Sequence, residues 1–158
     1  NIIELISKVY AEMLPKAQEQ KINLEFVKPV ETLPKVQTDP ERVEQVLINL
    51  IGNSLKFTPD NGTIKILINY NHSEKTETVS VIDNGKGISK EDMPKLFQKF
   101  SMVGNNYLVK QNAQGTGLGL YLSKAIIELL NGKIWVESEG KGKGSKFSFT
   151  LKTDDAKV

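Results

Sequence analysis

Three polar side chains form a stripe along a segment that is otherwise apolar, between Asp39 and Thr58. Asn49, Asn53 and Lys56 recur at steps of four and three residues, which places them on one face of a helix. Two carboxamides and an ammonium group on a largely buried helix are costly unless something pairs with them. A carboxamide oxygen suits Mg²⁺, and a lysine neutralises phosphate. The stripe therefore predicts one wall of a site for a metal-bound polyphosphate, and the solvated face of an ordinary surface helix is the alternative.

A second segment, residues 83–88, ends a predicted strand in a glycine turn. Asp83 has the same parity along the strand as Val79 and Val81, so its carboxylate points to the face that those valines bury. A carboxylate in that position needs a donor, and the exocyclic amine of adenine is one candidate. An aspartate that accepts a hydrogen bond from its own turn is the alternative, and the sequence leaves both open.

A third segment, residues 115–120, has the sequence GTGLGL and opens a predicted helix. Glycines allow a close approach of the backbone to phosphate, and free N–H groups at a helix start attract anions. A dinucleotide-binding motif would need a strand directly before it, whereas the polar segment 101–114 precedes it and has the length of a lid. Residues 140–146 lack the Gly-Lys-Ser/Thr of a P-loop and fit a glycine hairpin turn with a packing role.

Composition narrows the class of protein. The chain has 158 residues, enough for one domain with a real core, and its net charge of +2 comes with dispersed lysines that do not indicate nucleic-acid binding. It contains no cysteine, which excludes disulfides and thiolate metal sites and fits a reducing compartment. No apolar run is long enough to span a bilayer. We expect a cytoplasmic domain that is monomeric in isolation.

Hydrophobic periodicity places these segments on alternating elements. Helices are predicted over residues 2–15 or shortly beyond, 40–58, 89–100 and 118–130, and strands over 22–26, 63–70, 78–83, 133–137 and 146–151. Asp39 and Pro40 are typical of a helix start. We expect one domain over residues 1–152, opened by a leading helix in residues 1–20, and a C-terminal tail at 153–158.

The order of the segments resembles the ATP-binding catalytic domain of sensor histidine kinases, in the superfamily of gyrase B, MutL and the ninety-kilodalton heat-shock chaperone. The resemblance covers an N box, a first glycine box, an F box, a second glycine box and a C-terminal glycine turn, at residues 45–58, 83–88, 97–100, 115–120 and 142–145. Four boxes in this order are specific, whereas no single box is. The resemblance implies an α/β fold: a two-layer Bergerat-type sandwich with a mixed sheet of about five strands and three main helices on one face.

The resemblance also implies a ligand, MgATP, and a set of contacts. Asn53, helped by Asn49, would hold Mg²⁺, Lys56 would contact phosphate oxygens, and Asp83 would bind the adenine amine. Asn53 and Lys56 are the implied catalytic residues, and residues 101–114 would fold over the triphosphate. The other implied nucleotide contacts are Phe57, Gly85, Gly87, Ile88, Gly115, Thr116, Gly117, Leu118, Gly119 and Leu120. Phe97 and Phe100 are expected to pack, and anchoring of the lid is their functional alternative.

The activity implied is transfer of the γ-phosphoryl group of MgATP to a histidine on a dimerisation domain outside this chain, with a response regulator downstream. A conformational ATPase like gyrase B or MutL is the second hypothesis. Those relatives carry a glutamate four residues before the metal-binding Asn, whereas Asn49 stands here and cannot act as a general base. A nucleotide-binding module with weak or no catalysis is the third, because Ser101 and Met102 replace the Tyr-Arg that often follows the F box. His72, the only histidine, lacks the family's phosphoacceptor pattern and is expected at the surface.

Overall fold

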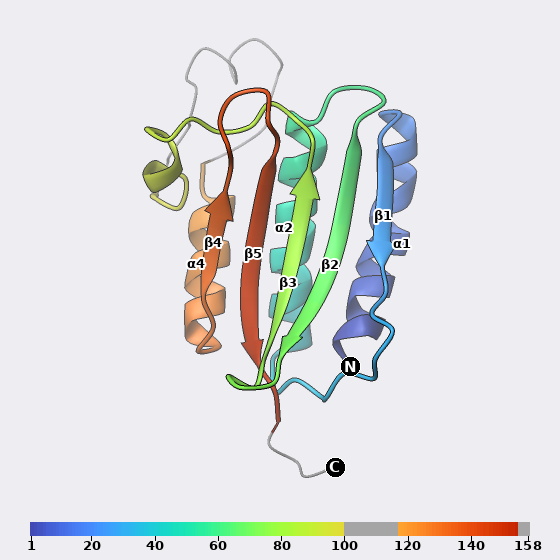
Figure 1. The fold of residues 1–158 in the computed structure, drawn as a ribbon, viewed down its shortest axis with the longest axis vertical. Coiled ribbons are helices and arrows are strands. Elements are labelled where there is room, and N and C mark those ends of the chain that lie inside the picture. Colours follow the sequence, from blue (N-terminus) through green and yellow to red (C-terminus); the bar gives the residue numbers. More distant parts are fainter. Residues whose placement is uncertain (100–116, 155–158) are drawn as a thin grey trace.

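Alternating apolar and polar residues give the sheet one apolar face, and three helices cover that face (Figure 1). The computed structural model describes residues 1–99 and 117–154. Its five strands lie in the order β1-β2-β3-β5-β4, with β1 parallel to β2 and the other pairs antiparallel. The helices are α1 (Ile2–Glu19), α2 (Pro40–Phe57) and α4 (Gly119–Leu129), and the strands are β1 (Asn23–Val27), β2 (Thr63–Asn71), β3 (Thr76–Asp83), β4 (Ile134–Glu137) and β5 (Ser145–Lys152). The predicted two-layer α/β sandwich is confirmed.

The core lies between the helices and the covered face of the sheet. Its fully buried members from the sheet and from α2 include Ile64, Ile66, Val79, Val81, Phe149, Val43, Val46, Leu47, Leu50 and Ile51. The side chains of β3 that point to the covered face begin with Glu77 and end with Asp83, because both alternate in step with the two buried valines between them. Asp83 has hydrogen-bond partners, whereas neither carboxylate oxygen of Glu77 has one among the described residues. Burial raises the pKa of Glu77 to about 7.

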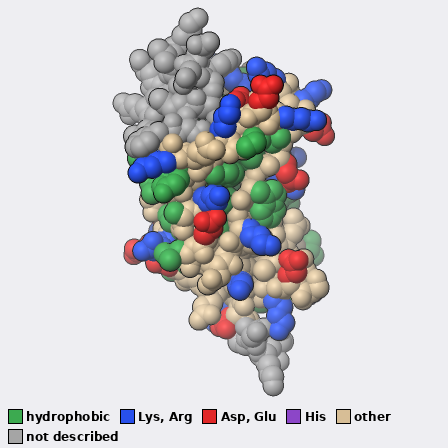
Figure 2. Space-filling view, turned by 90° about the vertical axis from the view of Figure 1, so that its left-hand side faces the viewer, with side chains coloured by type: hydrophobic (Ala, Val, Ile, Leu, Met, Phe, Trp, Pro, Cys, Tyr) green, Lys and Arg blue, Asp and Glu red, His purple; other side chains and the backbone are tan. Residues whose placement is uncertain are grey.

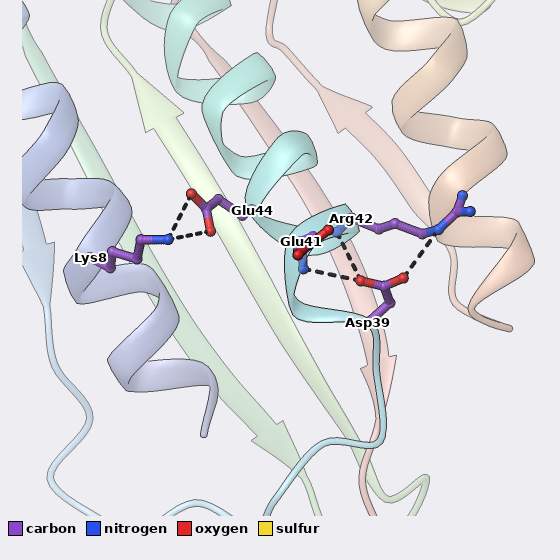
Figure 3. Close-up of polar contacts among 5 residues, drawn as sticks. All are labelled: Lys8, Asp39, Glu41, Arg42 and Glu44. Atoms are coloured by element: carbon purple, nitrogen blue, oxygen red, sulfur yellow. Dashed lines mark hydrogen bonds and ion pairs between the residues drawn. The ribbon is translucent and has the colours of Figure 1, made fainter.

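The helix α2 begins as the sequence predicts (Figure 3). Asp39 Oδ1 accepts from the backbone N–H groups of Glu41 and Arg42, at 3.1 and 3.3 Å, and Pro40 stands in the first turn, where no N–H is needed. An exposed ion pair between Lys8 Nζ and a Glu44 carboxylate oxygen, 2.8 Å apart, joins α1 to α2, and this contact raises the pKa of Lys8. The start of α2 is thus capped, and the ion pair ties this part of α2 to the middle of α1.

One predicted helix differs from the structure, and another has the predicted extent. The spacing predicted an end near Pro15 or shortly after, within a leading helix of residues 1–20, and α1 continues through this exposed proline to Glu19, so that its last turn buries Ala17 completely. Residues 89–100 were predicted to be helical, and this is wrong for the described part, which holds only the short 3₁₀ turn η1 (Met93–Lys95). The backbone N–H of Lys95 donates to the carbonyl oxygen of Asp92, and that of Leu96 donates to Met93, which is the 3₁₀ pattern of hydrogen bonds three residues apart. Pro94 has no N–H to donate to an α-helical bond. Phe100 lies outside the described residues.

The side of the molecule formed by α4 and β4 carries apolar side chains at the surface (Figure 2). The large exposed ones there are Tyr121, Leu122 and Leu129 of α4 and Trp135 of β4.

The remaining predicted elements agree with the structure within one or two residues. None of the helices in the part of the chain described here combines the length and the hydropathy that a bilayer crossing requires.

Candidate functional site

A pocket of about 430 Å³ opens at the end of the sheet where β3 finishes. Its walls come from the last turns of α2, the loop after β3, the first turn of α4, and the turn between β4 and β5. Six residues that the sequence proposed for a nucleotide line it: Asn53, Phe57, Asp83, Gly87, Ile88 and Leu120. The fold therefore gathers three of the four motifs, which are far apart in the sequence, around one cavity.

Asp83 forms the polar floor of the pocket and is 6% exposed. Its Oδ1 accepts from the backbone N–H of Gly85 at 2.9 Å, and its Oδ2 accepts from Ser54 Oγ at 3.1 Å and Ser145 Oγ at 2.7 Å. The two interpretations of this aspartate are thus compatible, because it stabilises its own turn and also faces the cavity. A carboxylate offers about four acceptor positions, so three donors leave room for one more. That position suits an amine of a bound ligand.

The side walls near Asp83 are apolar. Phe57, Ile88, Leu96, Leu120 and Phe147 provide them. Phe97 packs edge-on against Phe147, with ring centroids 6.3 Å apart and an interplanar angle of 73°, so Phe97 has the packing role expected for it. An apolar slot with a carboxylate at its base is suited to a flat ring that carries an amine.

The loop after β3 and the turn between β4 and β5 touch backbone to backbone. Gly87 has φ of +68°, and a Cβ there would collide with the carbonyl oxygen of Gly140. Gly85 does not line the pocket, but its N–H orients Asp83. The glycines of this motif therefore allow close packing of two loops, one of which presents Gly87 and Ile88 to the cavity.

The polar stripe of α2 is divided between two roles. Asn53 lines the pocket, whereas Asn49 and Lys56 are not among its lining residues. Asn49 Nδ2 donates to Ser123 Oγ at 2.8 Å, which ties α2 to α4, and Lys56 Nζ lies 5.7 Å from the centroid of the Phe57 ring. Within the stripe, Asn53 therefore lies at the cavity, whereas Asn49 contacts the neighbouring helix α4.

The start of α4 lies against this stripe. A Cβ at Gly119 would collide with the side-chain amide of Asn49, which would have to move, so glycine lets the two helices approach with Asn49 in place. Gly117 has φ of +69° and lies just before Leu118, the residue that caps α4. The proposed contacts Gly115 and Thr116, the predicted lid at 101–114, and Ser101 and Met102 lie outside the described residues.

Several residues of the site had no individual contact assigned from the sequence, although residues 140–146 were expected to pack as a glycine turn. Ser54 and Ser145 hold Asp83, and Lys141 and Gly142 line the pocket from the turn between β4 and β5. Ser145 could have been found from strand pairing, since it lies directly opposite Asp83 in the β3–β5 register. Ser54 follows Asn53 but lies off the polar stripe, so the spacing of the stripe gives no signal for it.

The donor chemistry near the pocket limits how a metal ion would be held. Within residues 1–99 and 117–154, no group of three or more histidine or carboxylate side chains is arranged as a metal site. Asn53 offers a carboxamide oxygen, which is a type of ligand that hard cations accept, and Mg²⁺ commonly takes its other ligands from substrate phosphates and water. The residues present therefore fit a cation that arrives with a phosphorylated ligand.

Comparison with known sequences identifies the family to which the chain is similar. Residues 38–155 match the model of the histidine kinase-, DNA gyrase B- and HSP90-like ATPase family. The adaptive-response sensory kinase SasA of Synechococcus sp. (strain JA-2-3B'a(2-13)) is 37% identical over 147 residues, which cover 93% of this chain and 37% of that protein. The sensor histidine kinase WalK of Bacillus subtilis (strain 168) is 39% identical over 116 residues, covering 73% of this chain and 18% of that protein. The chain spans well under half of these curated relatives.

Solved structures give the same likeness at the level of the fold. The catalytic domain of histidine kinase ThkA superposes with a TM-score of 0.81 at 35% identity, covering 97% of this chain and 93% of that one. Full-length ShkA, solved in complex with AMPPNP, superposes with a TM-score of 0.81 at 28% identity, covering 99% of this chain and 31% of that one. The match to ThkA spans nearly all of both chains.

Proposed function

This chain belongs to the histidine kinase-, DNA gyrase B- and HSP90-like ATPase family and is a catalytic domain of the sensor histidine kinase type, and on that premise we propose its ligand and reaction. The domain binds MgATP and transfers the γ-phosphoryl group to a histidine on a dimerisation domain outside this chain. A response regulator is the downstream partner in this two-component pathway, and the reaction takes place in the cytoplasm, where ATP is supplied.

The observation that carries the proposal is the buried carboxylate of Asp83 in the pocket wall, beside the apolar side chains of Phe57, Ile88 and Leu120. Ser54, Ser145 and Gly85 fix its orientation and occupy three of its acceptor positions, which leaves one for a ligand. Adenine presents an exocyclic amine as a donor, whereas guanine presents a carbonyl oxygen at the same ring position. Asp83 therefore binds the adenine amine, and Phe57, Ile88 and Leu120 contact the faces and edges of the ring.

Asn53 is the residue best placed to hold the cation, since its carboxamide belongs to the pocket wall. The amide nitrogen of Asn49 is held by Ser123, which leaves its oxygen as the group available to assist. Mg²⁺, when bound, supplies charge neutralisation on the phosphates. Lys56 extends from the last turn of α2 and contacts phosphate oxygens through its ammonium group.

Phosphoryl transfer requires mainly positioning and stabilisation of charge, because the protein does little covalent chemistry. In this domain the slot around Asp83 fixes the base, and α2 supplies Asn53 and Lys56 for the phosphates. The backbone around the start of α4, at Gly117 just before it and Gly119 in its first turn, approaches the phosphates because no side chain intervenes. The phosphoacceptor imidazole comes from the partner domain and attacks the γ-phosphorus, with ADP as the leaving group.

A conformational ATPase is not favoured. Activation of water needs a general base, and Asn49, which occupies the position of the glutamate in such relatives, donates its amide to Ser123. An amide that serves as a link between α2 and α4 accepts no proton from water.

Nucleotide calorimetry tests the proposal. The protein should bind MgADP more tightly than MgGDP, and Asp83→Asn should weaken MgADP binding by about 1–3 kcal/mol, because the amide brings a donor where the adenine amine already donates. Asp60→Asn, at an exposed position just after α2, is the matched control and should leave binding unchanged. Equal affinity of Asp83→Asn and the unmodified protein would place the base elsewhere.

A further inference from the structure

Ser138 stands directly after β4, and one hydroxyl group there joins two loops of the pocket. Its Oγ accepts from the backbone N–H of Ile88 at 3.0 Å and of Gly140 at 3.3 Å, and it donates to the carbonyl oxygen of Gly144 at 2.7 Å. Ile88 belongs to the loop after β3, whereas Gly140 and Gly144 belong to the turn between β4 and β5. Ser138 does not line the pocket, although Ile88 does.

Two backbone hydrogen bonds run beside this hydroxyl. Gly142 N–H donates to the carbonyl oxygen of Lys86 at 2.6 Å, and Gly144 N–H donates to that of Gly85 at 3.1 Å. Both loops contribute residues to the pocket, Gly87 and Ile88 from one and Lys141 and Gly142 from the other. The geometry of the pocket wall near Asp83 therefore depends on the contact between these two loops.

We propose that Ser138 is a positioning residue for the nucleotide, which acts by holding the turn of residues 138–144 against the loop of residues 84–88. The identity of the ligand in this inference rests on the function proposed above. Ser138 fixes Gly144, which directly precedes Ser145, and Ser145 Oγ in turn donates to Asp83. The hydroxyl thus sets the alignment of Asp83 and Ile88 without touching the ligand.

Removal of the hydroxyl leaves the N–H of Ile88 and the carbonyl of Gly144 without this partner, and a half-buried polar group that loses its partner moves to find another. The two backbone hydrogen bonds then hold the loops together alone, and the base end of the pocket loses its fixed geometry. Asn53 and Lys56 lie on α2 and keep their places, so the loss falls on nucleotide affinity rather than on the transfer step.

The test compares Ser138→Ala, Ser138→Thr and a matched control, Ser73→Ala, in the 158-residue chain. Ser73 also donates its hydroxyl within a turn, to Asn71 Oδ1 at 2.7 Å, but in the hairpin at the opposite end of β3. Calorimetry with MgADP should give a dissociation constant about tenfold higher for Ser138→Ala. Ser138→Thr retains the hydroxyl and should restore affinity to within about twofold of the unmodified protein, and Ser73→Ala should leave it unchanged.

Two further readouts separate positioning from general stability. Trp135 is the only tryptophan in the sequence and lies three residues before Ser138, so its fluorescence on titration with MgADP should change less in Ser138→Ala. With a dimerisation domain from the same parent as phosphoacceptor, the KM for ATP should rise about tenfold in Ser138→Ala while kcat stays within about twofold. A fall in kcat at constant KM would overturn the inference.

The outcomes distinguish this inference from the proposed function. If the unmodified protein does not bind MgADP, the proposed function fails. If it binds and Ser138→Ala binds equally well, or if Ser138→Thr is as weak as Ser138→Ala, Ser138 has no positioning role. If Ser138→Ala does not fold, as judged by circular dichroism, Ser138→Cys replaces it: the weaker thiol should give an intermediate affinity, and unchanged affinity would overturn the inference.

Discussion

Glu77 gives the stability of this domain a pH dependence that one substitution should remove. Its side chain is 0% exposed at the start of β3, and both carboxylate oxygens are buried without a hydrogen-bond partner among the described residues. Burial disfavours the charged form and raises the pKa of Glu77 from 4.5 to about 7. Glu77→Gln keeps the shape of the side chain and cannot ionise.

The direction of the pH dependence follows from which state of the protein, folded or unfolded, binds the proton of Glu77 more tightly. The folded state holds the proton of Glu77 up to about pH 7, whereas the unfolded chain releases it near 4.5. The contribution of this group to the free energy of unfolding is therefore fully present below pH 4.5, and it is lost as the pH rises through 7. The difference between the two pKa values corresponds to at most about 3 kcal/mol.

Urea unfolding at several pH values between 4.5 and 8 measures this directly, on the unmodified protein and on Glu77→Gln. The other carboxylates titrate in both proteins, so the difference between the two unfolding free energies isolates Glu77. That difference should shift in favour of Glu77→Gln by up to about 3 kcal/mol from pH 4.5 to 8. Glu74→Gln, which removes an exposed carboxylate from the adjacent turn, controls for the loss of a charge. A difference that stays constant with pH would refute the reasoning.

Four further outcomes are expected. Asp39→Ala should lower the unfolding free energy by about 1 kcal/mol in urea titrations, because two N–H groups of α2 lose their acceptor, and an unchanged midpoint would contradict that cap. Gly87→Ala should lower the free energy of unfolding by about 1–2 kcal/mol from its φ of +68° alone. It should also weaken MgADP binding, because the added Cβ collides with Gly140. Wild-type affinity in this variant would mean that the two loops can separate freely. The isolated domain should hydrolyse ATP about 10²–10⁴-fold more slowly than a hydrolase with a general base, and phosphate release at hydrolase rates would favour a conformational ATPase. It should also acquire no acid-labile label of its own, and a label that disappears in His72→Ala would show that His72 accepts phosphate.

The sequence predicted the elements well where local chemistry decides them. Asp39 and Pro40 marked the start of α2, and parity along β3 placed Asp83 on the buried face, because capping and alternation are properties of neighbouring residues. Local signals failed in residues 89–100, where the spacing predicted a helix. Pro94 has no N–H to donate, and the described part of this segment forms only the 3₁₀ turn η1.

The site was predictable in its parts but not in its assembly. Asn49 and Asn53 share a helical face, yet only contact with Ser123 of α4 shows that Asn49 faces the neighbouring helix. The two serine partners of Asp83 lie 29 positions before it and 62 after it, so no local pattern reports them. The role of Ser138 depends on the docking of two loops, which only the paired sheet determines.

The central claim is transfer of phosphoryl from MgATP through a site that includes Asn53. The most direct measurement mixes this domain, γ-labelled ATP and a purified dimerisation domain from the same parent, for the unmodified protein, Asn53→Ala and the exposed control Asn69→Ala. We predict acid-labile label on a histidine of the dimerisation domain with the unmodified protein and with Asn69→Ala, and its near-complete loss with a folded Asn53→Ala. Absence of label with an unmodified protein that binds nucleotide, or normal labelling by Asn53→Ala, would contradict the account.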